Sequence, residues 1–501
     1  MSIIQLRNLA FTYQDAPQPA LRDVTVQIER GELLALIGRA GAGKTTFCTL
    51  LAGFMPQFFS GQLQGSAFVD GLDVLATPIG QVARSVGLVS ANPAAQISGA
   101  RFTVFEEIAF GLENIGLPPA EIVERVTWAL GALDIAELRE RSPYALSGGQ
   151  QQRLAIAAAL ALRPPVLVLD EPIAQLDPRA ARELAQLLRS LAAGGTTIVI
   201  AEHRLKWVTA LADRTLALER GRVIANGTPA EALAALAALP APQPARLAAV
   251  QTQPNPFPAL QPIVQAEAIS YRYPSGVAAL QDITFSVSAG ERIAMLGRNG
   301  AGKSTLVRHL NGLLPPASGR VLVAGNDTRR TSVAGCARHV GLVFQDVRNQ
   351  LFARSVREEL RFGPRMLRRS AAEVELLVDS ALDTLGLREL AGEHPYDLPP
   401  ATRRLVAIAA VLAMAPPLLV LDEPTSGLDT LGVTRLIELC LQRASQGVST
   451  LLVTHDLDFA RQAAARVIVL DQGRLALDSS WDTLDANERA QLAATVGLPV
   501  G

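Results

Sequence analysis

Short apolar segments recur along the chain and predict buried parallel strands. Strands that are covered on both faces read as continuous apolar runs, not as alternating ones. The longest run, Val406–Leu421, is too short to cross a bilayer and is interrupted by Pro416 and Pro417, so we expect a buried helix followed by a buried strand. Four shorter runs have the same character: Leu33–Ile37, Val166–Leu169, Ile293–Leu296 and Leu418–Leu421.

The pattern is duplicated. From about residue 107 onward the two copies are offset by 252 residues, for example between Asp170 and Asp422. A constant offset over such a span predicts two domains, which we place at residues 1–232 and 263–501, with a linker at 233–262. Residues 240–262 hold seven prolines and one charged residue, Arg246. A proline-rich tether of this kind spans roughly 3 Å per residue, so the halves can face each other and form a head-to-tail intramolecular dimer.

Two of the apolar runs are followed by a glycine-rich loop and then by a helical pattern. Such loops curl so that backbone N–H groups face the phosphates of ATP, a lysine adds positive charge, and a Thr or Ser hydroxyl binds Mg²⁺. The predicted ATP-binding residues are Gly38, Gly41, Gly43, Lys44, Thr45 and Thr46 in the first half and Gly297, Gly300, Gly302, Lys303, Ser304 and Thr305 in the second.

The other two runs each end in a pair of carboxylates, Asp170-Glu171 and Asp422-Glu423. Acidic groups at the end of a buried strand are costly unless they are used. We expect Asp170 and Asp422 to bind Mg²⁺ together with Thr45 or Ser304, and Glu171 and Glu423 to act as general bases on the attacking water.

Composition narrows the choice of partners and compartment. The chain has 501 residues, of which 49% are hydrophobic and 19% charged, which is enough to build two cores. Its formal net charge of -1 disfavours nucleic acid as a partner. Three widely spaced cysteines predict packed thiols in a reducing compartment, and the N-terminus does not resemble a signal peptide.

The segment Leu146-Ser147-Gly148-Gly149-Gln150 precedes an Ala- and Leu-rich stretch, and with it the chain resembles the ABC ATPase family over nearly its whole length. The resemblance implies an α/β fold: two P-loop domains in tandem, each with a RecA-like sheet core, an antiparallel β subdomain and a helical signature subdomain. It also implies that Ser147, Gly148, Gly149 and Gln150 contact a nucleotide held by the other half.

The resemblance assigns further roles to single residues. Tyr13 and Tyr273 match the aromatic that stacks on adenine, although each could equally pack on its sheet. His203 and His455 match the histidine that contacts the γ-phosphate. Gln345 matches the glutamine that touches Mg²⁺ and couples the site to a membrane subunit.

The two predicted sites are unequal. Ala91 stands where the second half has Gln345, and Pro399-Pro400-Ala401-Thr402 stands where the first half has its signature. Proline has no backbone N–H to donate. The resemblance implies that each site combines the phosphate loop of one half with the signature of the other, so we expect the site on Lys303 to hydrolyse ATP and the site on Lys44 to turn it over slowly. The alternative is that the altered signature at Pro399–Thr402 still supports ATP hydrolysis.

Both halves contain a Glu-Glu-x-x-Phe-Gly segment, at residues 106–111 and 358–363. It resembles ATPases of energy-coupling-factor importers, which take up vitamins, such as a thiamine precursor, or cobalt and nickel ions. The implied partners are a transmembrane coupling subunit and a substrate-binding membrane protein, with the ATPase peripheral on the cytoplasmic face of the membrane.

Other interpretations of these segments remain open. Each Glu-Glu-x-x-Phe-Gly segment could instead be part of an ordinary amphipathic helix whose two glutamates face solvent. The alternatives at the level of function are a sugar-type ABC importer and a soluble ribosome-associated ABC ATPase, whose linker is typically long, helical and charged. The absence of a long heptad insert excludes chromosome-maintenance ATPases.

Overall fold

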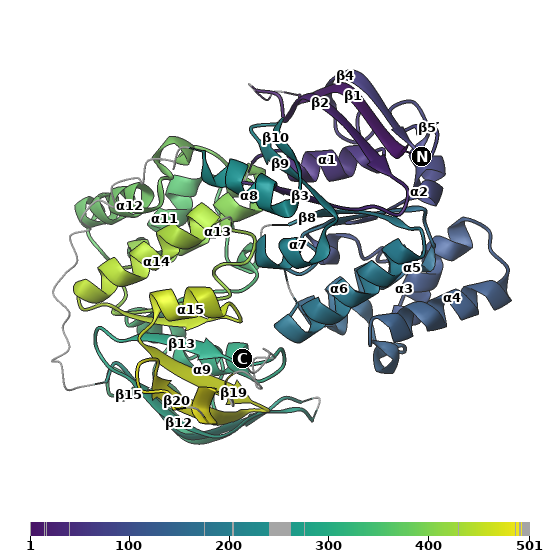
Figure 1. The fold of residues 1–501 in the computed structure, drawn as a ribbon. Coiled ribbons are helices and arrows are strands. Elements are labelled where there is room, and N and C mark those ends of the chain that lie inside the picture. The colour runs from purple at the N-terminus through teal and green to yellow at the C-terminus, as the bar shows by residue number, and fades with distance from the viewer. Residues whose placement is uncertain are drawn as a thin grey trace. The chain divides into compact units, whose positions relative to one another are not determined.

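The computed structural model describes residues 2–239 and 262–492, and the chain divides into two compact units, Met1–Pro240 and Ala241–Gly501 (Figure 1). Within those two ranges the positions left undescribed are Asp15, Pro17, Ala40, Gln175, His203, Arg204, Ser275, Asp429, Ala486, Ala490 and Gln491.

An antiparallel sheet of four strands opens the first unit, in the order β2-β1-β4-β5. Apolar and polar residues alternate along β2, which buries one face and exposes the other, as expected for a sheet covered on one side. The strands are β1 (Ser2–Tyr13), β2 (Leu21–Glu29), β4 (Gly61–Val69) and β5 (Leu72–Asp73).

A six-stranded sheet in the order β10-β9-β3-β8-β7-β6 forms the centre of the first unit, parallel except for the β9–β10 pair. Val166 and Val168 of β7 face one core and Leu167 and Leu169 the other, which explains the unbroken apolar run. The strands are β3 (Leu33–Gly38), β6 (Val86–Val89), β7 (Val166–Asp170), β8 (Thr197–Ala201), β9 (Arg214–Glu219) and β10 (Arg222–Gly227).

Helices α3, α4 and α5 of the first unit pack on one another and form a helical subdomain (Figure 1). The helices are α1 (Lys44–Leu51), α2 (Ile79–Ser85), α3 (Val104–Asn114), α4 (Pro119–Ala132), α5 (Gly148–Ala161), α6 (Pro178–Ala193), α7 (Leu205–Leu211) and α8 (Pro229–Ala237).

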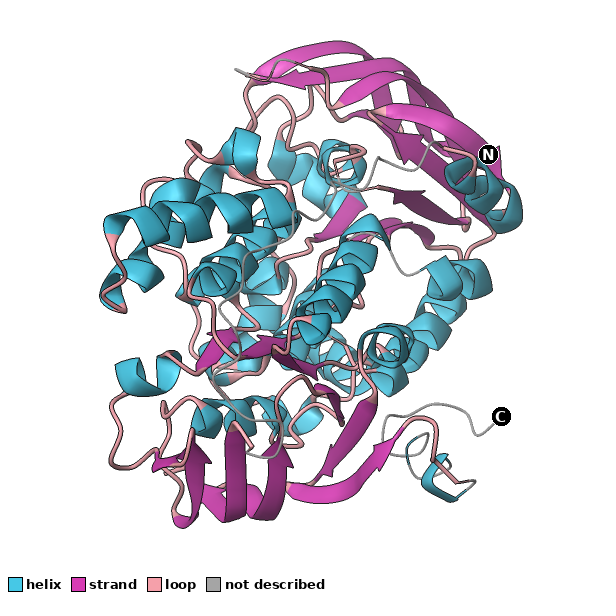
Figure 2. Cartoon of the chain, turned by 90° about the vertical axis from the view of Figure 1, so that its left-hand side faces the viewer, coloured by secondary structure: helices cyan, strands magenta, loops and turns pink. Residues whose placement is uncertain are grey.

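The second unit repeats this plan. Its antiparallel sheet has the order β12-β11-β14-β15 and its mixed sheet the order β16-β17-β18-β13-β19-β20. Figure 2 shows the helices of each unit gathered to one side of its antiparallel strands. The elements are β11 (Val264–Arg272), β12 (Ala278–Val287), β13 (Arg292–Leu296), α9 (Lys303–Leu310), β14 (Ser318–Val323), β15 (Asn326–Asp327), α10 (Val333–Ala337), β16 (Val340–Val343), α11 (Val356–Met366), α12 (Ala371–Leu385), α13 (Pro400–Ala413), β17 (Leu418–Asp422), α14 (Thr430–Ser445), β18 (Ser449–Val453), α15 (Leu457–Ala463), β19 (Arg466–Asp471) and β20 (Arg474–Ser480).

The expected fold is confirmed, including the helix α13 and strand β17 within the long apolar run. None of the helices that the structure describes is long and apolar enough to span a membrane. Cys48, Cys336 and Cys440 are buried free thiols. Helix α8 runs to Ala237, past the residue at which we end the first domain, and linker residues 240–261 lie outside the described residues.

Candidate active sites

Each phosphate loop joins a central strand to a short helix, β3 to α1 and β13 to α9. The residue before each helix, Gly43 or Gly302, has a positive φ near 100°, and a Cβ there would lie 2.4 Å from the backbone oxygen of Ala20 or Ala279. Only glycine fits such a position. Each helix begins after a glycine, which has no side chain to cap it, and the start of an α-helix is a position that favours an anion.

The loop lysines reach back across their own loops. Lys44 Nζ donates to the oxygens of Gly38 at 2.9 Å and Arg39 at 3.2 Å. Lys303 Nζ donates to the oxygens of Gly297 at 2.7 Å and Arg298 at 3.0 Å. These bonds hold each ammonium group inside the curve of the loop, where a phosphate would meet it.

The two tyrosines at the ends of the antiparallel sheets contact the phosphate-loop helices. The Tyr13 hydroxyl lies 3.1 Å from Thr46 Oγ1, and the Tyr273 hydroxyl lies 3.0 Å from Thr305 Oγ1. Both hydroxyls therefore fix a ring beside the predicted nucleotide site. Burial raises the pKa of Tyr13, and its ring also packs edge-to-face on Phe11 at 4.9 Å. Both interpretations of these residues, adenine stacking and packing on the sheet, fit this position.

Asp422 and Ser304 offer the oxygen ligands that Mg²⁺ prefers. Ser304 hydrogen-bonds to the Asp422 carboxylate, whose Oδ1 atom is buried and has no hydrogen-bond partner in the part of the chain described. Burial raises the pKa of Asp422 to about 6. A divalent cation would satisfy this buried oxygen, so the residues fit Mg²⁺. In the first half, Asp170 is equally buried at the end of β7, while the Thr45 side chain is exposed.

Glu423 and His455 form a buried pair in the second unit. His455 Nδ1 lies 2.9 Å from the Glu423 carboxylate. Glu423 has a φ of +50°, and its N–H donates to Val453 O at 2.8 Å. Glu171 adopts the same φ and donates to Ala201 O at 2.8 Å, so both carboxylates leave the sheet by the same turn. His203 lies outside the described residues.

Gln345 follows β16 and Ala91 follows β6, the strands that pair with β17 and β7. Gln345 therefore lies at the carboxyl ends of the parallel strands, where Asp422 also lies. An arginine that the motifs did not single out contacts this edge: Arg404 of α13 donates to Gln345 O and to Glu423 O, both at 3.0 Å. In the sequence, the only sign of this contact is that Arg404 stands at the position where the first half has Gln152.

The two signature segments begin helices of equal length by different means. The Ser147 hydroxyl caps α5, and Gln150 completes a capping box. Pro399 occupies the same position before α13 and makes no side-chain cap, while Pro400 is the first helical residue. Proline is well tolerated at that position, so the helix survives. The second half therefore has no counterpart of the Ser147 hydroxyl, and Pro399 and Pro400 have no backbone N–H that could reach a nucleotide.

The Glu-Glu segments do not present a solvated acidic face, because one glutamate of each pair is buried. Glu107 accepts hydrogen bonds from Ser98 N and Oγ at 2.7 and 2.8 Å. Glu359 accepts from Phe352 N and Ala353 N at 2.8 and 2.7 Å. Each buried carboxylate thus ties helix α3 or α11 to the loop before it, which is a role that helical periodicity does not reveal.

Comparison with known proteins identifies the family. The ABC transporter family profile matches residues 21–174 and 280–426. A relative from Methanosarcina acetivorans, inferred to be an ABC transporter ATP-binding protein, is 36% identical over 480 residues, covering 95% of this chain and 90% of its own. A similarly described relative from Streptomyces avermitilis is 36% identical over 532 residues, covering 95% and 93%.

A solved structure of cbiO1 from Clostridium perfringens, part of the ABC transporter complex cbiONQ, is 34% identical and covers 46% of this chain and 95% of its own, with a TM-score of 0.42. The family profile falls once on each half and begins upstream of each phosphate loop. The chain therefore belongs to the ABC transporter family, as a tandem pair of ATP-binding and ATP-hydrolysing domains.

Proposed function

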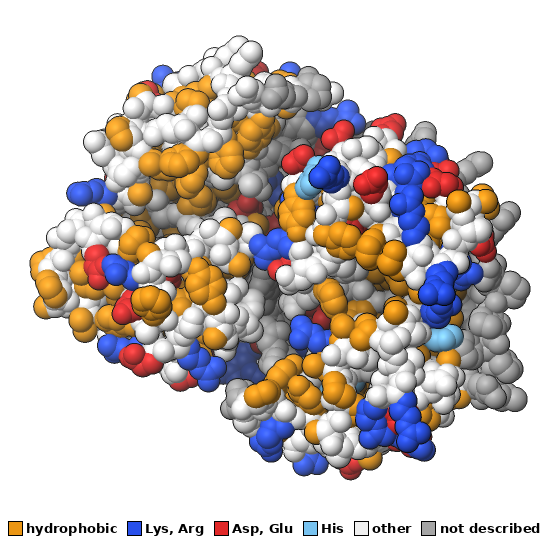
Figure 3. Space-filling model, turned by 180° about the vertical axis from the view of Figure 1, so that it is seen from behind, with side chains coloured by type: hydrophobic (Ala, Val, Ile, Leu, Met, Phe, Trp, Pro, Cys, Tyr) orange, Lys and Arg blue, Asp and Glu red, His pale blue; other side chains and the backbone are white. Residues whose placement is uncertain are grey.

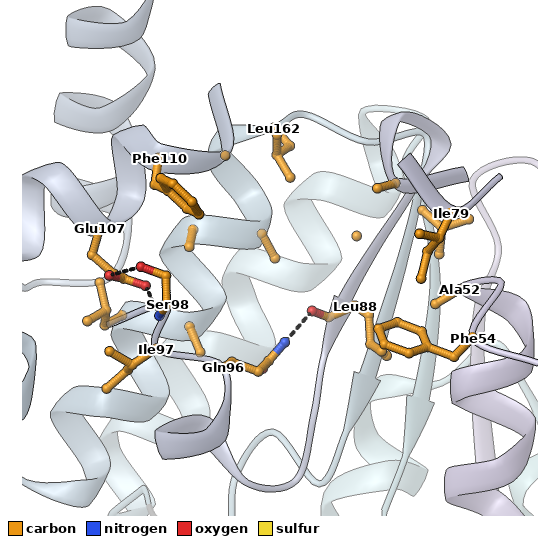
Figure 4. A pocket seen from close by; sticks show the side chains of 18 residues that line it. Ala52, Phe54, Ile79, Leu88, Gln96, Ile97, Ser98, Glu107, Phe110 and Leu162 are labelled. Carbon is orange, nitrogen blue, oxygen red and sulfur yellow. Dashed lines mark hydrogen bonds between the residues drawn. The ribbon is translucent and has the colours of Figure 1, made fainter. Parts of the chain in front are cut away.

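We propose that the chain is the ATPase of an energy-coupling-factor-type importer, attached to the cytoplasmic face of the membrane through a transmembrane coupling subunit that works with a substrate-binding membrane protein. The observation that carries this proposal is the Glu-Glu-x-x-Phe-Gly segment and its surroundings. In the first unit this segment forms one wall of an apolar pocket of about 350 Å³ (Figure 4). Micronutrients such as a vitamin or a cobalt or nickel ion are the solutes that this type implies.

The pocket has the composition of a helix-binding groove. Ile97, Phe110 and Leu162 line it on the side of the helical subdomain. Phe54, just after α1, and Ile79 of α2 line it on the other side (Figure 4). Polar anchors are few: the figure shows Gln96 bound to Leu88 O and Glu107 bound to Ser98. An amphipathic helix of the coupling subunit fits such an apolar groove. Figure 3 shows further hydrophobic patches set among charged side chains on one face of the molecule.

The second unit carries the residues for ATP hydrolysis. Lys303 and the start of helix α9 would hold the phosphates. Asp422 and Ser304 would hold Mg²⁺, and the ion would balance the negative charge of the phosphates. Glu423 would accept the proton of the attacking water, with its carboxylate oriented by His455. The signature Ser147-Gly148-Gly149 of the first half completes this site in a head-to-tail dimer of the two domains.

The site on Lys44 is proposed to bind ATP and to hydrolyse it slowly. It lacks a glutamine at Ala91, and it would receive the helix that begins with Pro399 and Pro400. Neither proline can donate an N–H to a γ-phosphate.

The pocket is tested by affinity purification of the tagged chain from its native cells in mild detergent, followed by mass spectrometry. We expect recovery of a small transmembrane subunit and a substrate-binding membrane protein. Ile97→Asp should reduce that recovery, because it places a charge in the apolar groove. Val123→Asp is the matched control, since Val123 is an exposed residue of α4 that does not line the pocket. Recovery of ribosomes without membrane proteins would overturn the proposal.

A further inference from the structure

Arg404 is a buried cation below the candidate hydrolytic site. Only 8% of its surface is exposed, although it stands one turn into helix α13. Its two terminal nitrogens each donate to one backbone oxygen at 3.0 Å, Nη1 to Glu423 O and Nη2 to Gln345 O. A guanidinium presents its donors in a fixed plane, so the two bonds set the distance between their acceptors.

Those acceptors belong to segments that leave the sheet side by side. Strands β16 and β17 pair in parallel up to Val343 opposite Leu421, and Gln345 and Glu423 each lie two residues further along. Past the end of the ladder no strand pairing holds the two segments together. Glu423 leaves the sheet at this point with a φ of +50°, as Glu171 does in the first unit. The guanidinium of Arg404 replaces the missing ladder bonds at this point.

Charge favours the same arrangement. Burial lowers the pKa of Arg404, and the nearby carboxylates of Glu423, Asp346 and Asp422 oppose that change. Arginine remains protonated in proteins, so its positive charge lies beneath a cluster of acidic groups. These acidic groups favour the buried position of the guanidinium, and so favour the two backbone contacts that it makes.

The first unit lacks this connection. Gln152 occupies the equivalent place in α5 and is fully buried. Within the described residues neither its Nε2 nor its Oε1 has a hydrogen-bond partner. The half that has Gln345 thus has the arginine that holds it, and the half with Ala91 has neither.

We propose that Arg404 is a positioning residue for ATP hydrolysis, which fixes the Gln345 segment against the Glu423 turn. This inference rests on the proposed function, in which the second phosphate loop belongs to the hydrolytic site.

The test is Arg404→Gln in the full-length chain, which installs the residue of the first half. We expect kcat for ATP hydrolysis to fall on the order of 10- to 100-fold, as small displacements of catalytic groups do, with KM for ATP changed less than about twofold. Arg404→Lys should give an intermediate kcat, because an ammonium can donate to one of the two carbonyls. Arg443→Gln is the matched control: Arg443 is 3% exposed, lies near the end of α14, and should affect thermal stability but not kcat.

Several outcomes would overturn the positioning role: an unchanged kcat in Arg404→Gln, an equal loss in Arg443→Gln, or a kcat in Arg404→Lys no higher than in Arg404→Gln. Glu423→Gln, measured in parallel, separates the two proposals. If Glu423→Gln abolishes hydrolysis while Arg404→Gln does not, only the positioning role fails. If Glu423→Gln keeps full activity, the proposed hydrolytic site itself is wrong.

Discussion

His455 Nδ1 lies 2.9 Å from the carboxylate of Glu423, and each side chain is only 9% exposed. The contact joins the ends of two neighbouring strands, β17 and β18, at the edge where Asp422 also lies. A carboxylate that is held in one orientation and shielded from water is suited to accept a proton from a single bound water. The backbone bond from Glu423 N to Val453 O fixes the same pair from the main chain.

The two candidate bases should differ in their contribution to turnover. We expect Glu423→Gln to lower the steady-state ATPase rate on the order of 100-fold or more, as the loss of a general base does. Glu171→Gln should cost much less, because its site would receive the proline-containing signature. A coupled-enzyme assay at saturating Mg²⁺ and ATP measures both. Comparable losses in the two variants would contradict the asymmetry.

Binding should be less asymmetric than hydrolysis. Lys44 and Lys303 make matching bonds within their loops, and both helices begin without a side-chain cap. We therefore expect Lys44→Ala and Lys303→Ala each to remove one bound nucleotide per chain, while only Lys303→Ala abolishes hydrolysis. Equilibrium dialysis with ATP in the absence of turnover gives the stoichiometry. An unchanged stoichiometry in Lys44→Ala would mean that the first loop does not bind ATP.

What could be predicted from the sequence was local in the chain. The strand, glycine loop and helix around Lys44 and Lys303 follow from spacing alone, because the loop's own backbone builds the site. The contacts of Arg404 and Glu359 could not be predicted, since they join a helix to segments 59 and 7 residues away whose approach depends on packing. The sequence pattern around these two residues could not tell a buried polar group from an exposed one.

Asp422→Asn should stabilise the nucleotide-free chain. The folded protein holds the Asp422 proton up to about pH 6, whereas the ordinary pKa is 3.8, so ionisation costs folding free energy as the pH rises through that window. Removing the charge should raise the free energy of unfolding on the order of 1–3 kcal/mol at pH 8, and by less at pH 5. Thermal unfolding without Mg²⁺ measures this. Asp482→Asn, at an exposed aspartate, is the control and should change nothing.

Restoring the second signature should activate the first site. The variant carries four substitutions, Pro399→Ser, Pro400→Gly, Ala401→Gly and Thr402→Gln. They give α13 the same capping residues that Ser147 and Gln150 provide in α5. They also return the N–H groups that proline lacks. In a Glu423→Gln background, where only the first site retains a base, we expect residual ATPase to rise on the order of tenfold, since donors to a developing negative charge have effects of that size or larger.

The matched control is the same set of four substitutions in a Glu171→Gln background. There the restored signature faces a site without its base, so the rate should not rise, although α13 should gain about 1 kcal/mol from its new cap. An equal increase in both backgrounds would show that the change acts through general stability. No increase in either would place the defect of the first site elsewhere, at Ala91 or Gln152, where the second half has Gln345 and Arg404.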